Sequence, residues 1–215
     1  MHSEIVRKII RAYDDPIVRA YCWVRFGILR QRFLDEIGQY LPETGPVLDI
    51  GCGFGLFSLY YAATAPRRFV RGIDVSARRI AIARRAAGRL SIANVTYAEG
   101  DAREFKGDGE FAAAYMLDIV HHIPPATVPP LLQALRRSLG RDGVLLVKDV
   151  DSRPAPKRWF TWLLDRAMAP ATPVHYWSAD ALTAALDRAG FVVRRHLMVD
   201  LLPYPHVLYV CEARP

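Results

Sequence analysis

Three alternating glycines between two apolar segments constrain this chain more than any other feature. Residues 47–60 read VLDIGCGFGLFSLY, so Gly51, Gly53 and Gly55 separate a segment typical of a buried strand from one typical of a helix. Glycine has no Cβ, and it therefore adopts backbone angles closed to other residues and lets a ligand approach the main chain. The pattern predicts a ligand-binding turn between a strand and a helix.

A second apolar segment ends in Asp74, about 20 residues beyond the glycine turn. A carboxylate at this distance can accept hydrogen bonds from ribose hydroxyls, which indicates an adenosine-containing ligand. The dinucleotide fingerprint G-x-G-x-x-G does not fit, because Leu56 occupies its sixth position and the third glycine comes one residue early. The Lys-Ser/Thr pair of a phosphate loop is missing as well.

The pattern Asp-x-Gly-x-Gly-x-Gly that begins at Asp49 resembles the first motif of the class I S-adenosylmethionine-dependent methyltransferases. In that family an acid ending the second strand binds the ribose, and an acidic position after the third strand meets the adenine amine. Asp74 and Asp101 match these positions, and the resemblance implies S-adenosylmethionine as the cofactor. The residues that it assigns to the cofactor are Tyr13, Asp49, Gly51, Cys52, Gly53, Asp74, Val75, Gly100, Asp101, Ala102, Met116 and Leu117.

Some of these assignments carry a specific expectation. Asp49 is expected to orient the glycine turn through backbone hydrogen bonds, and Met116 and Leu117 to line the pocket near the sulfonium. Tyr13 belongs to an N-terminal segment that often closes over the cofactor in the resembling subfamily. Cys52 is a small residue that suits a tight turn, and we expect no redox role for it.

The segment after the fourth predicted strand, residues 118–124 with the sequence DIVHHIP, resembles the subfamily that methylates quinones, lipids and other small molecules. If the acceptor is a hydroxyl, His121 and His122 are candidate catalytic bases, because a neutral imidazole accepts a proton near pH 7. The competing interpretation is that one or both histidines support the loop through hydrogen bonds to the backbone. The resembling motifs together span roughly residues 47–150.

Alternation of strands and helices predicts an α/β fold: a Rossmann-like, doubly wound, mostly parallel seven-stranded sheet with an antiparallel last strand. The last two strands are joined by Pro203-Tyr204-Pro205, a link too short for a crossover helix. Helices are expected at 4–13 and 17–40, and Ser76 and Ser178 are expected to cap two further helices. Strands are predicted near 47–50, 69–74, 95–99, 111–117, 144–150, 191–201 and 207–213.

We expect one domain spanning residues 1–215, because no linker or repeat divides the chain. Its hydrophobic share of 52% is enough for a large core. The parts are an N-terminal helical cap at 1–44, a cofactor-binding core at 45–150, a lid-like insertion at 151–177 and a C-terminal helix with the antiparallel strand pair at 178–215.

The insertion separates the fifth strand from the next helix by far more than a normal loop. Ligands of open α/β folds bind at this end of the sheet, so we favour a lid over an apolar acceptor. A helix that packs on the N-terminal cap and a contact with an anionic membrane are the alternatives. The candidate acceptor-binding residues are Trp159, Trp162, His175, Tyr176 and Trp177.

The three cysteines are scattered and lack C-x-x-C spacing, so neither a disulfide framework nor a metal site is predicted. No apolar run reaches the length of about 18 residues that spans a membrane. We expect a cytoplasmic protein, soluble or at most peripheral to the inner face of a membrane. The oligomeric state and the acceptor atom, whether oxygen, nitrogen or carbon, stay open.

The net charge of +7 raises the question of nucleic-acid binding. Adjacent arginines occur at 67/68, 78/79, 84/85, 136/137 and 194/195, mostly where solvated surfaces are expected. Methyltransferases of nucleobase amino groups typically carry Asn/Asp-Pro-Pro-aromatic after the fourth strand, and residues 116–119 do not match it. We therefore expect a methyltransferase of an apolar small-molecule or lipid-like acceptor.

Two alternatives remain open. An RNA or protein methyltransferase is favoured if the arginines gather into one stripe beside the cofactor. A non-catalytic cofactor-binding subunit is favoured if Met116, His122 or Trp177 blocks the pocket.

Overall fold

The computed structural model describes residues 4–107, 110–151, 174–198 and 206–214. They form one seven-stranded sheet in the order β3-β2-β1-β4-β5-β7-β6. β7 runs antiparallel to β5 and β6, whereas the other neighbouring strands pair in parallel. The predicted Rossmann-like sheet with an antiparallel last strand is confirmed. The strands are β1 Thr44–Ile50, β2 Arg67–Asp74, β3 Val95–Glu99, β4 Phe111–Leu117, β5 Leu139–Val150, β6 Phe191–Leu197 and β7 His206–Ala213.

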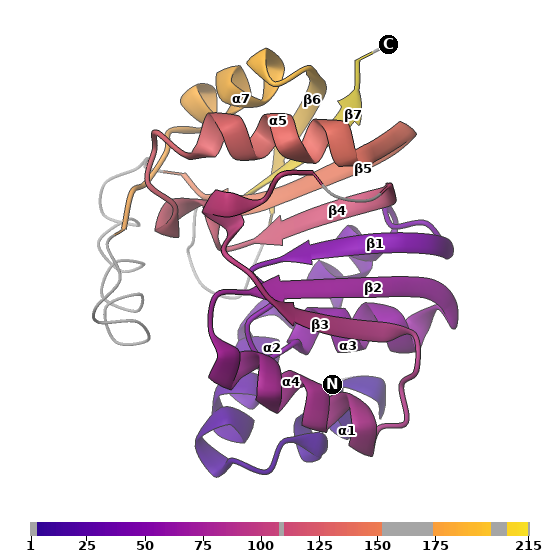
Figure 1. Ribbon diagram of the computed structural model, residues 1–215. Coiled ribbons are helices and arrows are strands. Elements are labelled where there is room, and N and C mark those ends of the chain that lie inside the picture. Colours follow the sequence, from indigo (N-terminus) through magenta and orange to yellow (C-terminus); the bar gives the residue numbers. More distant parts are fainter. Residues whose placement is uncertain (1–3, 108–109, 152–173, 199–205, 215) are drawn as a thin grey trace.

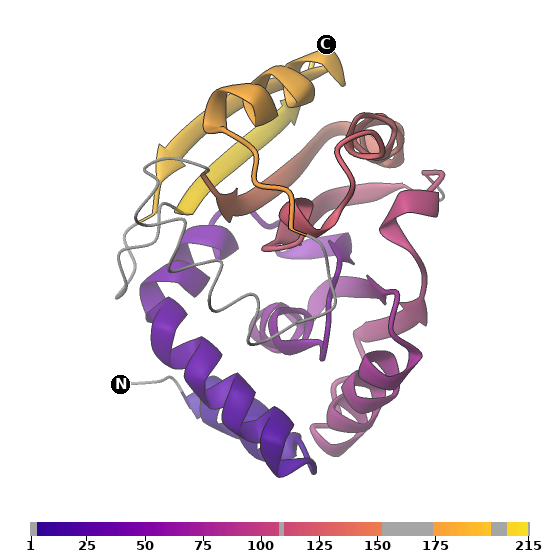
Figure 2. The same ribbon diagram turned by 90° about the vertical axis from the view of Figure 1, so that its left-hand side faces the viewer.

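Helices cover both faces of the sheet, and each face buries its own hydrophobic cluster. Figures 1 and 2 show α5 and α7 on one side of the sheet, with α1, α2 and α4 on the other. The carboxyl ends of the parallel strands all lie at the same end of the sheet, where ligands of such folds bind. The helices are α1 Glu4–Ala12, α2 Pro16–Gly38, α3 Leu56–Thr64, α4 Ala77–Arg89, α5 Val128–Ser138 and α7 Ala179–Arg188, with short 3-10 turns η1 Ala102–Glu104 and η2 Val120–His122.

Ser76 and Ser178 cap helices as predicted, and Asp15 caps a third helix. The Ser76 hydroxyl accepts a hydrogen bond from the Arg79 amide at 3.3 Å, and Ser178 accepts one from Ala181 at 3.2 Å. Asp15 accepts from the Ile17 amide at 2.8 Å before the proline that opens α2. Each cap satisfies an amide that has no partner inside its own helix.

The long second helix differs from the uninterrupted helix predicted at 17–40. Arg30 has φ 50° and ψ 169°, which breaks the helical backbone at one point inside α2. Apolar residues continue on one face across the break, with Phe26, Leu29 and Phe33 all buried. Periodicity alone therefore could not reveal the kink.

Arg68 corrects the expectation that the paired arginines lie on solvated faces. Its side chain is buried, and its guanidinium donates hydrogen bonds to the carbonyls of Pro42, Tyr61 and Leu41. These carbonyls belong to the end of α3 and to the segment before β1, so Arg68 joins two elements. The neighbouring Arg67 is exposed as expected.

Among the described residues, no helix is long and apolar enough to cross a membrane. The predicted link Pro203-Tyr204-Pro205 and most of the predicted insertion, residues 152–173, lie outside the described residues.

Candidate cofactor and acceptor site

The glycine turn joins β1 to α3 with all three glycines in left-handed backbone. The φ angles of Gly51, Gly53 and Gly55 are 77°, 56° and 77°. A Cβ added at Gly51 would lie 2.0 Å from Ile119 Cδ1, and one at Gly55 would lie 2.5 Å from the Tyr97 hydroxyl. At Gly53 no atom of the described residues comes within 4 Å of an added Cβ. One face of the turn is therefore open at Gly53 and packed at the other two glycines.

Asp74 lies beside this open face, at the end of β2. Its Oδ2 accepts a hydrogen bond from the Gly53 amide at 2.9 Å, and its Oδ1 accepts one from the Ser76 amide at 2.9 Å. Each carboxylate oxygen has a second lone pair for a ligand hydroxyl. Val75, the next residue, is 62% exposed. A left-handed turn with room at Gly53 and an acid beside it fits an adenosyl ligand.

Asp49 makes different contacts from those expected. It is buried and accepts hydrogen bonds from the hydroxyls of Ser58 and Tyr115, rather than from backbone amides of the turn. Burial raises the pKa of the Asp49 carboxyl to about 7, although both hydroxyl hydrogen bonds oppose the rise. Asp49 therefore ties β1 to α3 and β4 beneath the turn. Cys52, within the turn, is also buried.

The segment after β3 joins the same edge of the sheet. The Gly100 amide donates to the Asp74 carbonyl at 3.0 Å, which places Asp101 and Ala102 next to the end of β2. The Asp101 carboxylate pairs with Arg103 and also accepts its amide at 2.8 Å. The hydrogen bond from Arg103 lowers the pKa of the Asp101 carboxyl.

Met116 and Leu117, at the end of β4, point to opposite faces of the sheet. Met116 is buried in the cluster beneath α5 and α7, whereas Leu117 packs in the cluster beneath α1 to α4. Successive side chains of a strand alternate between faces, so the two residues cannot line the same wall of a pocket. Met116 lies in the hydrophobic core.

The N-terminal segment lies on the glycine turn. The buried Tyr13 hydroxyl donates to the Phe54 carbonyl at 3.0 Å, and the Tyr21 ring meets the Phe54 ring edge-on at 5.6 Å. Arg79 of α4 lies 5.8 Å from the centre of the Phe54 ring. The turn is thus contacted by both the cap and α4.

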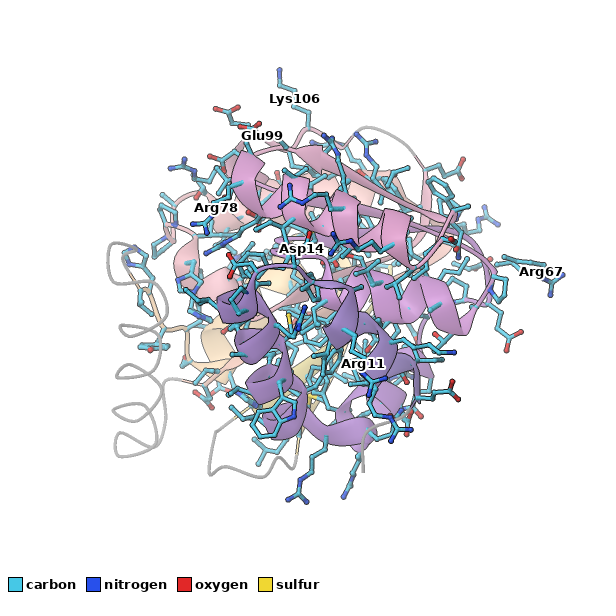
Figure 3. All side chains as sticks on the ribbon, turned by 90° about the horizontal axis from the view of Figure 1, so that it is seen from below. Arg11, Asp14, Arg67, Arg78, Glu99 and Lys106 are labelled. Carbon is cyan, nitrogen blue, oxygen red and sulfur yellow. The ribbon has the colours of Figure 1, made fainter. Side chains whose placement is uncertain are left out.

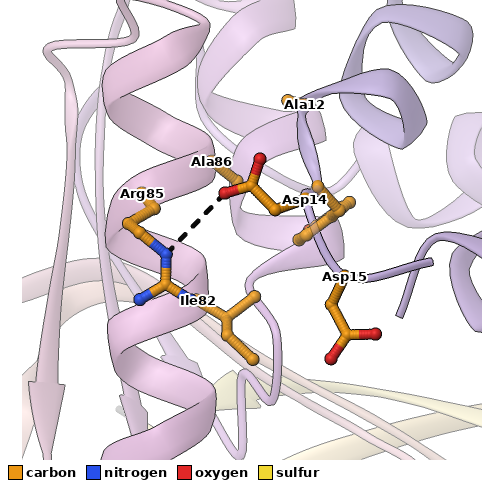
Figure 4. A pocket seen from close by; sticks show the side chains of 7 residues that line it. Ala12, Asp14, Asp15, Ile82, Arg85 and Ala86 are labelled. Atoms are coloured by element: carbon orange, nitrogen blue, oxygen red, sulfur yellow. Dashed lines mark ion pairs between the residues drawn. The ribbon is translucent and has the colours of Figure 1, made fainter. Parts of the chain in front are cut away.

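Ion pairs fasten the junction of α1 and α2 to α4. Asp15 lies 3.5 Å from Arg78, Asp14 lies 4.0 Å from Arg85, and Asp14 also pairs with Arg89. Figure 4 shows the ion pair between Asp14 and Arg85, both of which line a cavity of about 290 Å³. The residues lining this cavity do not include Gly53 or Asp74, so the cavity is separate from the glycine turn.

The two candidate histidines follow β4 in η2. His121 is buried, its Nδ1 contacts the Asp149 carboxylate, and its amide donates to Asp149 Oδ2 at 3.0 Å. The His122 ring centre lies 4.1 Å from that of His121. His121 is therefore oriented by a carboxylate of β5, a partner that neither interpretation of the sequence included.

Residues from the end of the predicted insertion lie against this turn. The His175 amide donates to the His121 carbonyl at 2.7 Å, and the Tyr176 ring stacks on the His121 ring at 5.9 Å. The indole nitrogen of the partly buried Trp177 has no hydrogen-bond partner among the described residues. Trp159 and Trp162 lie outside the described residues.

The structure also contains a charged cluster beside the end of β4, which the sequence analysis did not predict. Lys148 Nζ lies 2.6 Å from Asp118 Oδ1, and the Arg25 guanidinium donates to Asp118 Oδ2. The Lys148 side chain is fully buried. One feature of the sequence could have indicated this cluster, namely a lysine inside the apolar strand VLLVKDV. Its partners could not be identified from the sequence, because they come from distant parts of the chain.

The described arginines are distributed over opposite edges of the sheet. Arg84 and Arg85 lie on α4 beside β3, whereas Arg194 and Arg195 lie on β6 at the other edge. Figure 3 shows Arg67 and Arg78 extending from opposite sides of the molecule. These arginines do not form a single stripe.

Comparisons with known proteins agree with this geometry. A protein-family model described as a methyltransferase domain matches residues 25–196. An uncharacterized methyltransferase of Synechocystis sp. is 28% identical over 157 residues, which cover 70% of this chain and 69% of the relative. The 23S rRNA (uracil(747)-C(5))-methyltransferase RlmC of Yersinia pseudotuberculosis is 30% identical over 165 residues, which cover 75% of this chain. The match spans 35% of the length of that relative.

Solved structures share the fold. The magnesium protoporphyrin IX methyltransferase of Synechocystis, determined with bound S-adenosylhomocysteine, superposes with a TM-score of 0.66 at 20% identity, covering 86% of this chain and 83% of that one. The family model matches most of the chain and includes the glycine turn, Asp74 and the residues after β4. The chain therefore belongs to the methyltransferase-domain family and is an S-adenosylmethionine-dependent methyltransferase.

Proposed function

We propose that this methyltransferase acts on an apolar small-molecule or lipid-like acceptor. The contacts of His175 and Tyr176 with His121, in the turn after β4, carry the proposal. Partly buried aromatic side chains at the carboxyl edge of the sheet suit an apolar acceptor, because ligand pockets are lined mainly by such groups. The Trp177 indole N–H adds a donor for a polar atom of that acceptor.

We also propose a role for each of the main residues of the site. S-adenosylmethionine supplies the electrophilic methyl group when bound. Asp74 holds the ribose while it orients the Gly53 amide, and Tyr13 covers the turn from the cap. Asp149 keeps His121 in one orientation, so that the turn after β4 presents a fixed surface to the acceptor.

An RNA acceptor is the second candidate, because RlmC of Yersinia pseudotuberculosis is among the similar proteins. The net charge of +7 is compatible with it. Two of the described arginines use their guanidinium in contacts within the chain instead: Arg68 is buried, and Arg84 donates to the Tyr97 carbonyl. The apolar acceptor is favoured for this reason.

Calorimetric titration with S-adenosylhomocysteine tests the cofactor site. Replacing Asp74 by alanine should weaken binding about tenfold or more, because a hydrogen bond to a charged group is lost. Asp142→Ala removes an exposed acid elsewhere and should bind like the wild type. Thermal unfolding checks that Asp74→Ala is folded. Equal affinities of wild type and folded Asp74→Ala would contradict the assigned role.

Release of S-adenosylhomocysteine across a panel of apolar phenols, quinones, lipid vesicles and ribosomal RNA tests the acceptor class. We expect turnover with an apolar compound and a reduced kcat/KM for Trp177→Ala at unchanged S-adenosylhomocysteine affinity. Trp23→Ala is the matched control, because Trp23 is 61% exposed on α2. Turnover with RNA alone would overturn the proposal.

A further inference from the structure

The charged cluster of Arg25, Asp118 and Lys148 adjoins the glycine turn. The residue after Asp118, Ile119, packs where a Cβ of Gly51 would stand. Asp118 itself has φ 57°, a left-handed conformation uncommon for a residue other than glycine. Its amide donates to the Lys148 carbonyl at 2.8 Å, which fixes this conformation. Strained backbone of this kind is concentrated at functional sites.

Two cations and one anion lie in a largely apolar setting. Lys148 Nζ is 5.7 Å from the centre of the Phe33 ring, and the Arg25 guanidinium is 6.0 Å from that of Phe57. Burial opposes ionisation of Asp118, but Lys148, Arg25 and the nearby His206 hold the pKa of its carboxyl well below the usual range. Replacing a buried ion pair by well-packed apolar residues often leaves the stability of a protein unchanged or raises it. Stability alone is therefore a poor explanation for the cluster.

Arg25 is the most exposed member of the cluster. Its side chain is 24% exposed, compared with 14% for Asp118 and none for Lys148. Its guanidinium lies over Phe57, in the first turn of α3, so it stands next to the glycine turn. A guanidinium carries five N–H donors in a planar fork that suits an anionic oxygen group.

Building on the proposed function, we propose that Arg25, oriented by Asp118 above Lys148, binds an acidic oxygen of the acceptor as its anion. The acceptor is then a phenol, an enol or a carboxylic acid that carries the apolar body described above. The proton leaves to solvent when the oxygen binds, so deprotonation requires no histidine. Arg25 is the binding residue, and Asp118 and Lys148 are positioning residues.

The ionisation of 4-nitrophenol provides a direct test, because only its anion is yellow. The full chain is saturated with S-adenosylhomocysteine and titrated with 4-nitrophenol across pH, beside 4-nitroanisole, the neutral methyl ether. The bound phenol should have an apparent pKa lowered by about one unit. That shift corresponds to roughly tenfold preference for the anion over the neutral phenol.

Arg25→Gln should abolish this shift and leave S-adenosylhomocysteine affinity unchanged. Arg25→Lys, which keeps the charge without the fork, should retain part of the shift. Arg32→Gln is the matched control, because Arg32 is an exposed arginine of the same helix, and its shift should equal that of the wild type. A structural role of Arg25 alone would not move the pKa of a bound phenol.

The inference is overturned if the chain binds S-adenosylhomocysteine but binds the ether as tightly as the phenol, binds neither probe, or keeps the full shift in Arg25→Gln. Failure of the wild type to bind S-adenosylhomocysteine would instead count against the cofactor site of the proposed function.

Discussion

Gly51 and Gly53 share left-handed backbone, but they differ in what surrounds them. Gly51 packs against Ile119, whereas space is open beside Gly53 among the described residues. The first glycine is therefore required by packing, and the second is left for a ligand.

Alanine substitutions should separate these two roles. Gly51→Ala should lower the free energy of unfolding by about 2–4 kcal/mol, because the new Cβ meets Ile119 and the φ angle is unfavourable. Gly53→Ala should lower it by about 1 kcal/mol, from the φ angle alone. Yet Gly53→Ala should lose most of the S-adenosylhomocysteine affinity. Urea unfolding and calorimetry measure the two effects, and unimpaired binding by Gly53→Ala would show that the cofactor does not approach this face.

At the scale of elements, α2 joins the site to the core. Its first half carries Tyr21, which meets the glycine turn, and Arg25, which meets the end of β4. Its second half buries Phe33 and Ile37 in the cluster above the sheet. The break at Arg30 lies between these halves, so each half follows its own axis.

Arg30 has backbone angles that only glycine adopts without strain. Substitution of Arg30 by glycine is therefore predicted to stabilise the protein. Arg30→Gly should raise the free energy of unfolding by about 1 kcal/mol, because it relieves the positive φ. Arg32→Gly, two residues later within the helix, should lower it by about 1 kcal/mol. Urea unfolding of both variants gives the comparison, and a loss of stability in Arg30→Gly would show that the arginine side chain outweighs the strain.

At the scale of the whole molecule, Asp49 connects three elements through the Ser58 and Tyr115 hydroxyls. Burial raises the pKa of its carboxyl from 3.8 to about 7 in the folded chain. Between these pH values the folded state holds a proton that the unfolded state has released. The stability from the protonated acid is present below about pH 4 and is lost as pH rises to about 7.

Asp49→Asn should remove this dependence. Relative to the variant, the wild type should lose about 1 kcal/mol of unfolding free energy per pH unit across that window. Urea unfolding at several pH values measures the difference between the two proteins. Parallel pH profiles would show that Asp49 does not titrate in the folded chain.

The sequence by itself determined the glycine turn, Asp74, the helix caps and the alternation that produces the parallel sheet. These features depend on backbone freedom, capping and periodicity, which act over a few residues. Tertiary structure decided where β5 begins, at Leu139 rather than near 144, because its early residues pair with β4. It also placed the kink of α2.

The polar contacts of the site were decided by the tertiary structure as well. Asp149 meets His121 from 28 residues away, and Arg25 meets Asp118 from 93 residues away. No local pattern marks such partners, because the sheet and the packing of α2 bring them together. Sequence thus determined the cofactor turn and the fold class, and the tertiary structure determined which charges stand beside that turn, because electrostatic contacts depend on distance in space rather than along the chain.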